Sequence, residues 1–414
     1  MPVRAFFALL TLLPALSTQA QLAAAAYEQP PAVLAADLLP PEVRQSGHHR
    51  VRGQIALKGD MYVFDIDSDY GLYRVESLSM LLIRTHEVRT LAQAIGQYNV
   101  NNEQFAEELR GKLTYNAHSL VDVVKAPFSM AGQLVNNIGQ TAQELSDLGY
   151  SSLPESDGNL YVDDVSSDVI GGAHKRNIAY QLNLDPYSTN PRVQEFLNTV
   201  ARARSSGHFT AGMVTVRVPP SRLVTVADGK IDQQVKNAVK GLSPRELDQG
   251  IEQQLIQMGV DRESLSTFLK HPNYSPKHKT AITAYLDHLR GVRNRAALIR
   301  AALVAQGEAD ALSFEMLARM LAHYHYSVGE IAELDLLAEL PIAITRNGNA
   351  TVIMPVDYIY WDARSDQIFA ALGAHLESAG YADATLVIAG TLSEKSRAGI
   401  DAHGFKTLEQ FLFR

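Results

Sequence analysis

None of the 414 residues is a cysteine, and this absence constrains the chain more than any motif in it. A chain without thiols has no disulfides, zinc–thiolate centres or iron–sulfur clusters, so none of these can stabilise its fold. Its length is enough to bury a large core and predicts two or three domains. The same absence excludes a cysteine nucleophile and a lipid anchor on cysteine.

The composition is that of an ordinary globular protein, with 46% apolar and 20% charged residues. These fractions exclude a collagen-like protein, a largely disordered protein and a multi-span membrane protein. The formal net charge of −8 argues against a nucleic-acid partner, because domains that bind nucleic acid usually carry a basic excess.

The start of the chain has the pattern of an export signal. Arg4 supplies a positive charge, Ala5–Leu16 is apolar, and Thr18 and Ala20 are small residues at the −3 and −1 positions of a cleavage site. We therefore expect a signal peptide over 1–20, cleaved near Ala20, and a soluble or peripheral protein that is periplasmic or secreted. The alternative is an uncleaved anchor, although this apolar stretch is shorter than the ~20 residues that a spanning helix needs.

Hydrophobic periodicity and helix-start signals predict an α+β fold that is mostly helical. A β-rich N-terminal segment with helices precedes a central multi-helix domain, and a small ββαβα domain ends the chain. Shifts in composition divide the chain into a signal peptide (1–20), a flexible leader (21–50), strands followed by long helices (51–150), an acidic Ser-rich linker (151–168), a helical domain (169–335) and a small α/β domain (336–414).

Local patterns place the elements within these regions. Alternating apolar residues over 61–67 predict a strand with one buried face, strand character extends over 51–82, and helical periodicity follows over 84–98 and 101–149. Capping residues followed by proline mark helix starts at Asn190-Pro191, Ser243-Pro244 and Ser275-Pro276. Asn347-Gly348 separates two apolar runs and is typical of a tight hairpin with both turn residues at positive φ.

The polar face of the strand over 61–67 carries alternating acids. Asp65, Asp67 and Asp69 resemble the start of a calcium-binding loop, but that loop needs glycine at its sixth position, which is Tyr70 here. We therefore interpret these carboxylates as the solvent-facing side of a half-buried strand.

The sequence contains no established catalytic motif, because it lacks the GxSxG nucleophile elbow, the P-loop and the GxGxxG fingerprint. A hydrolase site assembled through space would still need a general base. His208, His271 and His278 are the candidates, since imidazole titrates near neutrality. We expect neither a bound metal nor a cofactor.

Two groups of residues are candidates for ligand binding. Arg290, Arg293 and Arg295 form the densest basic cluster, which would either bind an anionic ligand or form the wet face of a helix. Tyr358 and Tyr360 alternate after the hairpin and would either stack on a sugar or peptide or lie in the core at a domain interface.

Residues 116–149 are apolar and carry few charges. A buried helical hairpin, a contact with a partner helix and docking on a membrane surface all fit this composition. Surface-seeking helices usually carry Lys or Arg on their polar face, which favours the buried hairpin here.

Four segments together have a familiar order: 64–87 with its Tyr-Gly-Leu-Tyr core, 184–191, 268–280 and 386–405. In these segments the chain resembles a group of uncharacterised exported bacterial proteins. The resemblance covers about half of the mature chain. It implies one recurrent architecture over 51–414 and no established activity, cofactor or catalytic residue.

These observations leave the activity unknown and rank three hypotheses. The leading one is a non-enzymatic exported protein that binds or assembles with other molecules. The second is an exported hydrolase with a site that no sequence motif marks. The third is a peripheral envelope protein that docks through 116–149, so its partner would be an envelope protein or a membrane surface.

Overall fold

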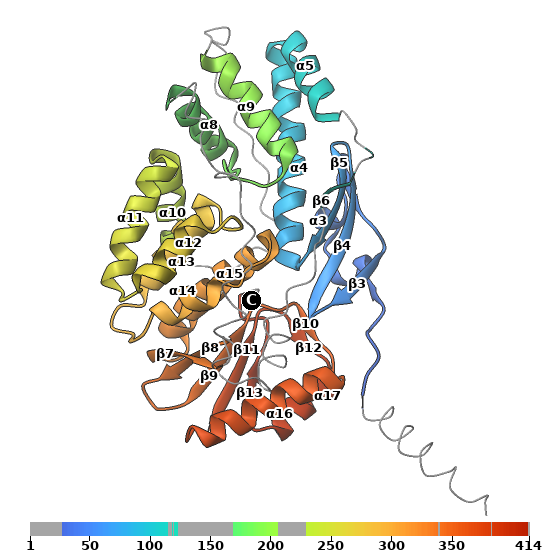
Figure 1. Cartoon of the computed structure of the whole chain (residues 1–414). Helices are drawn as coiled ribbons and strands as arrows, with labels where there is room; N and C mark the ends of the chain where they lie inside the picture. The colour runs from blue at the N-terminus through green and yellow to red at the C-terminus, as the bar shows by residue number, and fades with distance from the viewer. Residues whose placement is uncertain are drawn as a thin grey trace, which may run out of the picture.

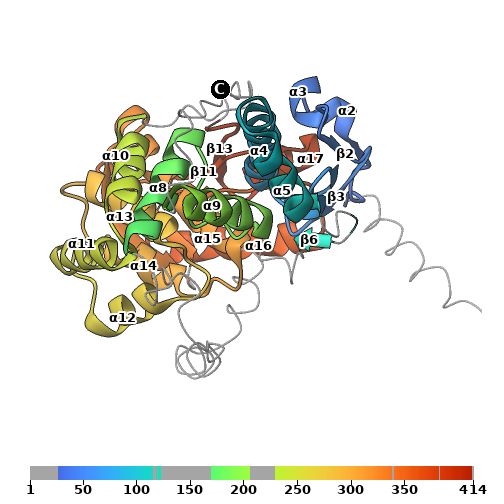
Figure 2. The ribbon, with the colours of Figure 1, turned by 90° about the horizontal axis from the view of Figure 1, so that it is seen from above.

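The computed structural model describes residues 27–114, 118, 120–122, 169–205, 229–337, 340–381 and 383–412. Within these residues the protein has the α+β, mostly helical fold that the sequence predicts, with an N-terminal sheet, a helical region and a C-terminal sheet (Figure 1). Seen from above, the N-terminal sheet and the helical region lie on opposite sides of the two longest N-terminal helices (Figure 2).

The N-terminal region is a sheet with helices packed on one face. Its elements are β1 (Val33–Leu34), α2 (Ala35–Leu38), α3 (Pro41–Arg44), β2 (His49–Val51), β3 (Gln54–Lys58), β4 (Met61–Ser68), β5 (Gly71–Glu76), α4 (Leu78–Asn101), α5 (Glu103–Thr114) and β6 (Leu120–Asp122). The long strand β4 pairs antiparallel with β2 and β3 along one edge and with β5 along the other. β1 extends the sheet beyond β3, and β6 pairs parallel with β5.

The alternation predicted over 61–67 is confirmed in β4. Phe64 and Ile66 are buried, and this face of β4 lies against α4, whereas Asp65 and Asp67 are only half-buried on the other face. The sheet therefore presents one covered apolar face and one open polar face, as antiparallel sheets commonly do.

Three N-terminal predictions differ from the structure. Helix α4 begins at Leu78, inside the predicted strand range, because Ser77 has a φ of 80° and its side chain accepts a hydrogen bond from the Met80 amide. Residues 27–50 of the expected flexible leader form β1, α2, α3 and the start of β2, with Val43 buried. Residues 120–122, expected to be helical, form the edge strand β6.

The helical region follows the predicted start signals. It contains α8 (Val169–Leu182), α9 (Pro191–Ser205), α10 (Gly229–Gly241), α11 (Pro244–Gln257), α12 (Arg262–Lys270), α13 (Pro276–His288), α14 (Ala296–Ala302) and α15 (Glu308–Ser327). Ser243 and Ser275 cap α11 and α13 through their side chains, and Asn190 accepts a hydrogen bond from the Arg192 amide at the start of α9. These three predicted helix starts are confirmed.

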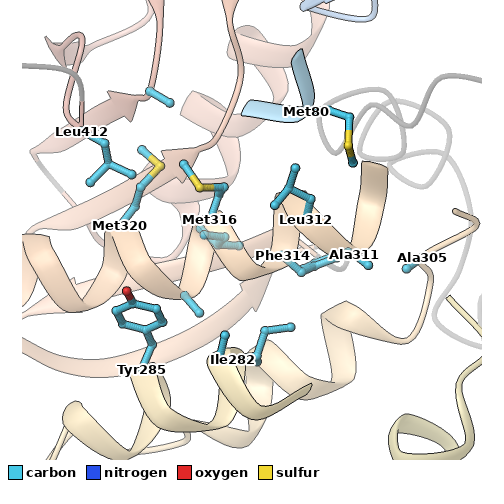
Figure 3. Close-up of a cluster of buried hydrophobic side chains, with 14 of the residues drawn as sticks. Met80, Ile282, Tyr285, Ala305, Ala311, Leu312, Phe314, Met316, Met320 and Leu412 are labelled. Carbon is cyan, nitrogen blue, oxygen red and sulfur yellow. The ribbon is translucent and has the colours of Figure 1, made fainter. Parts of the chain in front are cut away.

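Helix α15 is the centre of the molecule. Most of its side chains are buried, since it contacts α13 and α14 on one side and strand β9 of the C-terminal sheet on the other. Figure 3 shows Ile282 and Tyr285 of α13 below this helix, with Met80 of α4 and Leu412 of the C-terminus above it. A helix surrounded in this way joins all three regions through one core.

The C-terminal region is a mixed sheet between two layers of helices. Its elements are β7 (Ile331–Leu337), β8 (Leu340–Thr345), β9 (Ala350–Met354), β10 (Tyr358–Ile359), α16 (Ala363–Ser378), β11 (Ala384–Ile388), β12 (Thr391–Leu392), α17 (Glu394–Ala402) and β13 (Phe405–Leu408). The strand order is β13-β11-β9-β8-β7, with the first three strands parallel and β8 antiparallel to both neighbours. Helices α14 and α15 cover one face, and α16 and α17 cover the other (Figure 1).

The predicted hairpin is confirmed, with a looser turn than expected. β8 ends at Thr345 and β9 begins at Ala350, so four residues form the loop, and of these only Gly348 has a positive φ, at 81°. The sheet is also larger than the predicted ββαβα unit. β7 lies partly inside the range expected to be helical, and β13 follows the last predicted helix.

The acidic linker (151–168), His208 and all of 116–149 except His118 and β6 lie outside the described residues. Among the residues that the structure does describe, no helix is both long and apolar enough to span a bilayer.

Candidate functional site

A buried ion network joins α4 to the helical region. The side chain of Arg84 is 1% exposed and donates to Glu87 Oε2 (3.1 Å), Thr189 Oγ1 (2.9 Å) and Glu308 Oε2 (2.7 Å). These partners come from α4, from the loop after α8 and from the first turn of α15. One guanidinium therefore fixes three elements relative to one another.

The loop over 183–190 completes the partners of Glu87. Ser188 Oγ donates to Glu87 Oε1 (2.5 Å), and Asn190 Nδ2 donates to Glu87 Oε2 (2.9 Å). Burial raises the pKa of Glu87, and Arg84, Ser188 and Asn190 oppose that rise. The residues 184–191 and 64–87, two of the four segments in the resemblance, meet here.

A second half of the network links α13 to α15. His278 Nδ1 lies 2.7 Å from Glu315 Oε2, and both side chains are buried. Burial alone would raise the pKa of Glu315, but the charges of Lys277, His278 and Arg319 hold it well below its usual value. Arg319 also forms an ion pair with Asp232 of α10, at 2.8 Å, which extends the network to that helix.

Of the two predicted general bases that the structure describes, His278 has the surroundings that fit that role. Its Nδ1 is held by a carboxylate, which is how a base is oriented in hydrolases, and no described residue bonds its Nε2. His271 differs, because its Nε2 lies 3.1 Å from the Leu303 carbonyl oxygen and its Nδ1 accepts from the Asn273 amide. Burial lowers the pKa of His271, so we assign it to the core.

The predicted arginine cluster does not converge on one point. Arg290 is 82% exposed and lies 3.5 Å from Asp287, and Arg293 pairs with Glu333 of β7. Arg295 instead donates to the carbonyl oxygen of Leu286, at 2.9 Å. Each guanidinium has its own partner within the fold. The three arginines lie in the segment between α13 and α14, so the expectation that they form one face of a helix is wrong.

The two predicted tyrosines lie at the junction of the N-terminal and C-terminal regions. The Tyr358 ring stacks on Tyr62 of β4 with 6.2 Å between ring centroids. Burial raises the pKa of Tyr360, and Asp362 adds to that rise. Trp361 points elsewhere, since its ring stacks on Phe369 of α16. The pair at Tyr358 therefore supports the alternative of a domain interface.

Buried carboxylates at this junction were not predicted from the sequence. Asp357 Oδ2 accepts hydrogen bonds from the amides of Tyr62 and Leu78, both at 3.0 Å, so one side chain holds β4 and the start of α4. Burial raises the pKa of Asp357 to about 7 against the effect of these amides. Burial and the nearby charge of Asp310 likewise raise the pKa of Glu76 to about 7.

The open face of the N-terminal sheet is hollowed. A hollow of about 1410 Å³ lies between the chain around β1 and the outer faces of β2, β3, β4 and β5. We call it the basic hollow and define it by its charged lining, which consists of Arg44, Arg50, Arg52, Lys58, Arg74, Asp65 and Asp67. Five cations against two carboxylates make it positive in a chain whose net charge is −8.

Both carboxylates of the basic hollow are paired. Arg74 donates to Asp65 (2.7 Å) and Arg52 to Asp67 (2.9 Å), and about half of each guanidinium side chain stays exposed. The hydrogen bond from Arg74 lowers the pKa of Asp65, so this carboxylate stays ionised. No carboxylate among the described residues forms an ion pair with the remaining cations, which are Arg44, Arg50 and Lys58.

Two histidines that lie two residues apart in the sequence, His323 and His325, have different partners in the structure. His323 and His325 lie on the continuous helix α15, where His323 contacts the Phe411 ring and His325 Nδ1 accepts from the Ile331 amide. In the described part of the chain, no three His, Asp or Glu side chains are arranged to hold a metal ion.

No protein family, curated protein or solved structure matches the chain. The resemblance to a group of exported bacterial proteins therefore stays a prediction, and only the geometry of the site bears on function.

Proposed function

We propose that the chain is an exported, periplasmic or secreted, non-enzymatic protein that binds or assembles with another molecule through the basic hollow. The observation that carries this proposal is the position of the hollow. It lies on the outer face of the N-terminal sheet, lined by exposed arginines, whereas the candidate bases His271 and His278 are buried in the helical region.

The shape and the charge of the basic hollow support binding. An open hollow of about 1410 Å³ is larger than the usual site for a small molecule. Side chains that converge on it carry charge of one sign in excess, which accelerates association with a partner of the opposite sign. The proposal thus assigns recognition to the sheet and leaves α13 and α15 as the support of the fold.

Native mass spectrometry of the mature protein, purified from the envelope fraction or medium of its source cells, tests this proposal. We expect a retained partner mass that is released by salt and is absent from the double variant Arg50→Ala, Lys58→Ala. The control is Arg290→Ala, Arg293→Ala, which removes two exposed cations elsewhere. A bare protein mass in every sample, or equal retention by both double variants, contradicts the proposal.

A second candidate function is hydrolysis, and one observation favours it. The Glu315–His278 pair holds an imidazole whose Nε2 is bonded to no described residue. The matched variants are His278→Gln and His271→Gln, since both positions are buried but only the first has a free ring nitrogen. If a panel of ester, peptide and glycoside substrates shows turnover that His278→Gln abolishes and His271→Gln keeps, the hydrolase replaces the binding protein.

A further inference from the structure

We propose that the basic hollow binds an extended, acidic segment of a partner protein, with carboxylates of that segment on Arg50 and Lys58 and its apolar side chains on Ala56 and Val63. This inference deepens the proposed function and rests on it. Four features of the hollow lead to this class of partner.

The first feature is the arrangement of charge along the strands. Arg50 lies on β2 and Lys58 on β3, near the two ends of the hollow. Asp67 of β4 is the cross-strand partner of Arg50. Cations at both ends of an eight-residue-long strand, β4, suit a ligand that runs along it with a negative charge near each end.

The second feature is the apolar middle of the hollow. Ala56 is exposed and Val63 half-buried, and they form a cross-strand pair between the two charged ends. Val33 of β1 adds to the same lining. A segment that alternates acidic and apolar residues would contact both the cations and this apolar patch.

The third feature is curvature. A flat bilayer contacts protruding side chains, whereas the cations here line a hollow, so a chain segment reaches them and a membrane surface does not. A vesicle is therefore the weaker candidate, although its headgroups carry the same negative charge.

The fourth feature is the absence of stacking groups. No aromatic residue lines the hollow, which lies wholly within the described residues, and Asp65 and Asp67 lie among the cations. Single-stranded nucleic acids need aromatic platforms and a continuous basic track. A peptide with separate carboxylates tolerates both acids, because they are already paired with Arg74 and Arg52.

The test is a fluorescence anisotropy titration of the full mature chain with a labelled heptapeptide of alternating Glu and Val. We expect saturable binding that weakens at least about tenfold between about 50 and about 300 mM NaCl, because exposed charge contacts are screened over that range. We also expect a loss of about tenfold or more in Arg50→Ala, Lys58→Ala, and less than about twofold in Arg290→Ala, Arg293→Ala. The same peptide with Gln in place of Glu should bind at least about tenfold more weakly.

Three results would overturn the inference. Equal binding of the Gln peptide would show that charge does not select the ligand. Binding to phosphatidylglycerol vesicles, with no binding of the Glu peptide, would assign the hollow to a membrane. A salt-sensitive dimer that Arg50→Ala, Lys58→Ala dissociates would assign it to a second copy of the chain. The last two results would still leave a binding protein, whereas a bare mass in the native experiment removes the proposed function itself.

Discussion

The two sheets of this protein differ in the number of faces that helices cover. The C-terminal sheet lies between α14 and α15 on one side and α16 and α17 on the other, and β9 is buried along its whole length. The N-terminal sheet has α4 on one face and leaves the other open. We expect a partner to bind at the exposed face, because the side chains of a covered face are buried in the core.

The sequence patterns of the strands show the same difference between the two sheets. Residues 350–354 (ATVIM) are buried on both faces and carry no charge, whereas residues 61–67 (MYVFDID) alternate. A change on the open face should therefore affect binding, and the equivalent change in the covered sheet should affect folding.

The largest effect is expected for a charge placed between the helix layers. Val352→Asp buries a carboxylate in β9, where the wild-type side chain is 0% exposed, and should destabilise the protein by more than about 5 kcal/mol or prevent folding. Val63→Asp, on the open face of β4, should cost less than about 1 kcal/mol. Urea unfolding followed by circular dichroism measures both, and a comparable loss in the two variants would contradict the contrast.

A smaller but still large effect is expected for the ion pairs. Arg84→Ala leaves Glu87 buried without its guanidinium and should cost about 3–5 kcal/mol. Arg52→Ala removes an exposed pair with Asp67 on the open face and should cost at most about 1 kcal/mol. Chemical denaturation at neutral pH compares the stabilities of the two variants. If Arg52→Ala is the more destabilising change, the expected difference between the buried and the exposed pair is wrong.

We expect pH to have an intermediate effect on the free energy of unfolding, through buried carboxyl groups where the N-terminal and C-terminal regions meet. Burial raises the pKa of Asp357 and that of Glu76 to about 7, so the folded protein holds these protons more tightly than the unfolded chain does. Their stabilising contribution is full below the unfolded pKa of about 4 and is lost as the pH rises through about 7, by at most ~1.4 kcal/mol per pH unit for each group.

Asp357→Asn isolates this contribution. One carboxylate oxygen accepts both amide hydrogen bonds, and an amide oxygen in its place accepts them equally. Unfolding free energies measured between pH 5 and pH 8 should therefore fall less steeply for the variant than for the wild type. An unchanged slope would show that Asp357 does not titrate in this range.

The smallest effect is expected at the arginines outside the basic hollow. Arg290 is 82% exposed and pairs only loosely with Asp287, so Arg290→Ala should change the unfolding free energy by less than about 0.5 kcal/mol. Thermal unfolding at two salt concentrations checks this. A larger loss would indicate that the exposed cluster has a role that the structure does not show.

Local signals predicted much of the fold. The alternation in β4, the capped starts of α11 and α13 and the hairpin at Gly348 all depend on neighbouring residues, and all are present. The segment 27–50 was missed because its Ala- and Pro-rich composition resembles a loop. Tertiary contacts override that preference and bury Ala35, Leu39 and Val43.

The candidate site was predictable only in part. The outward carboxylates of β4 follow from alternation, but the basic hollow also needs Arg50 and the chain around β1, which the sequence placed in a leader. His278 and Glu315 lie 37 residues apart and meet only through the packing of α13 on α15. Arg84 and Glu87 have the spacing of an ordinary surface pair, and they are buried only where the loop over 183–190 and Glu308 of α15 meet them.

Hydrogen–deuterium exchange of the full chain, with and without a partner retained in native mass spectrometry or the Glu–Val peptide, tests most directly whether recognition takes place on the open face of the N-terminal sheet. We expect new protection in β2, β3 and β4 (residues 49–68), with unchanged exchange in β8, β9 and β11 of the covered sheet. Protection confined to α13 and α15 around His278, with none over residues 49–68, would contradict it.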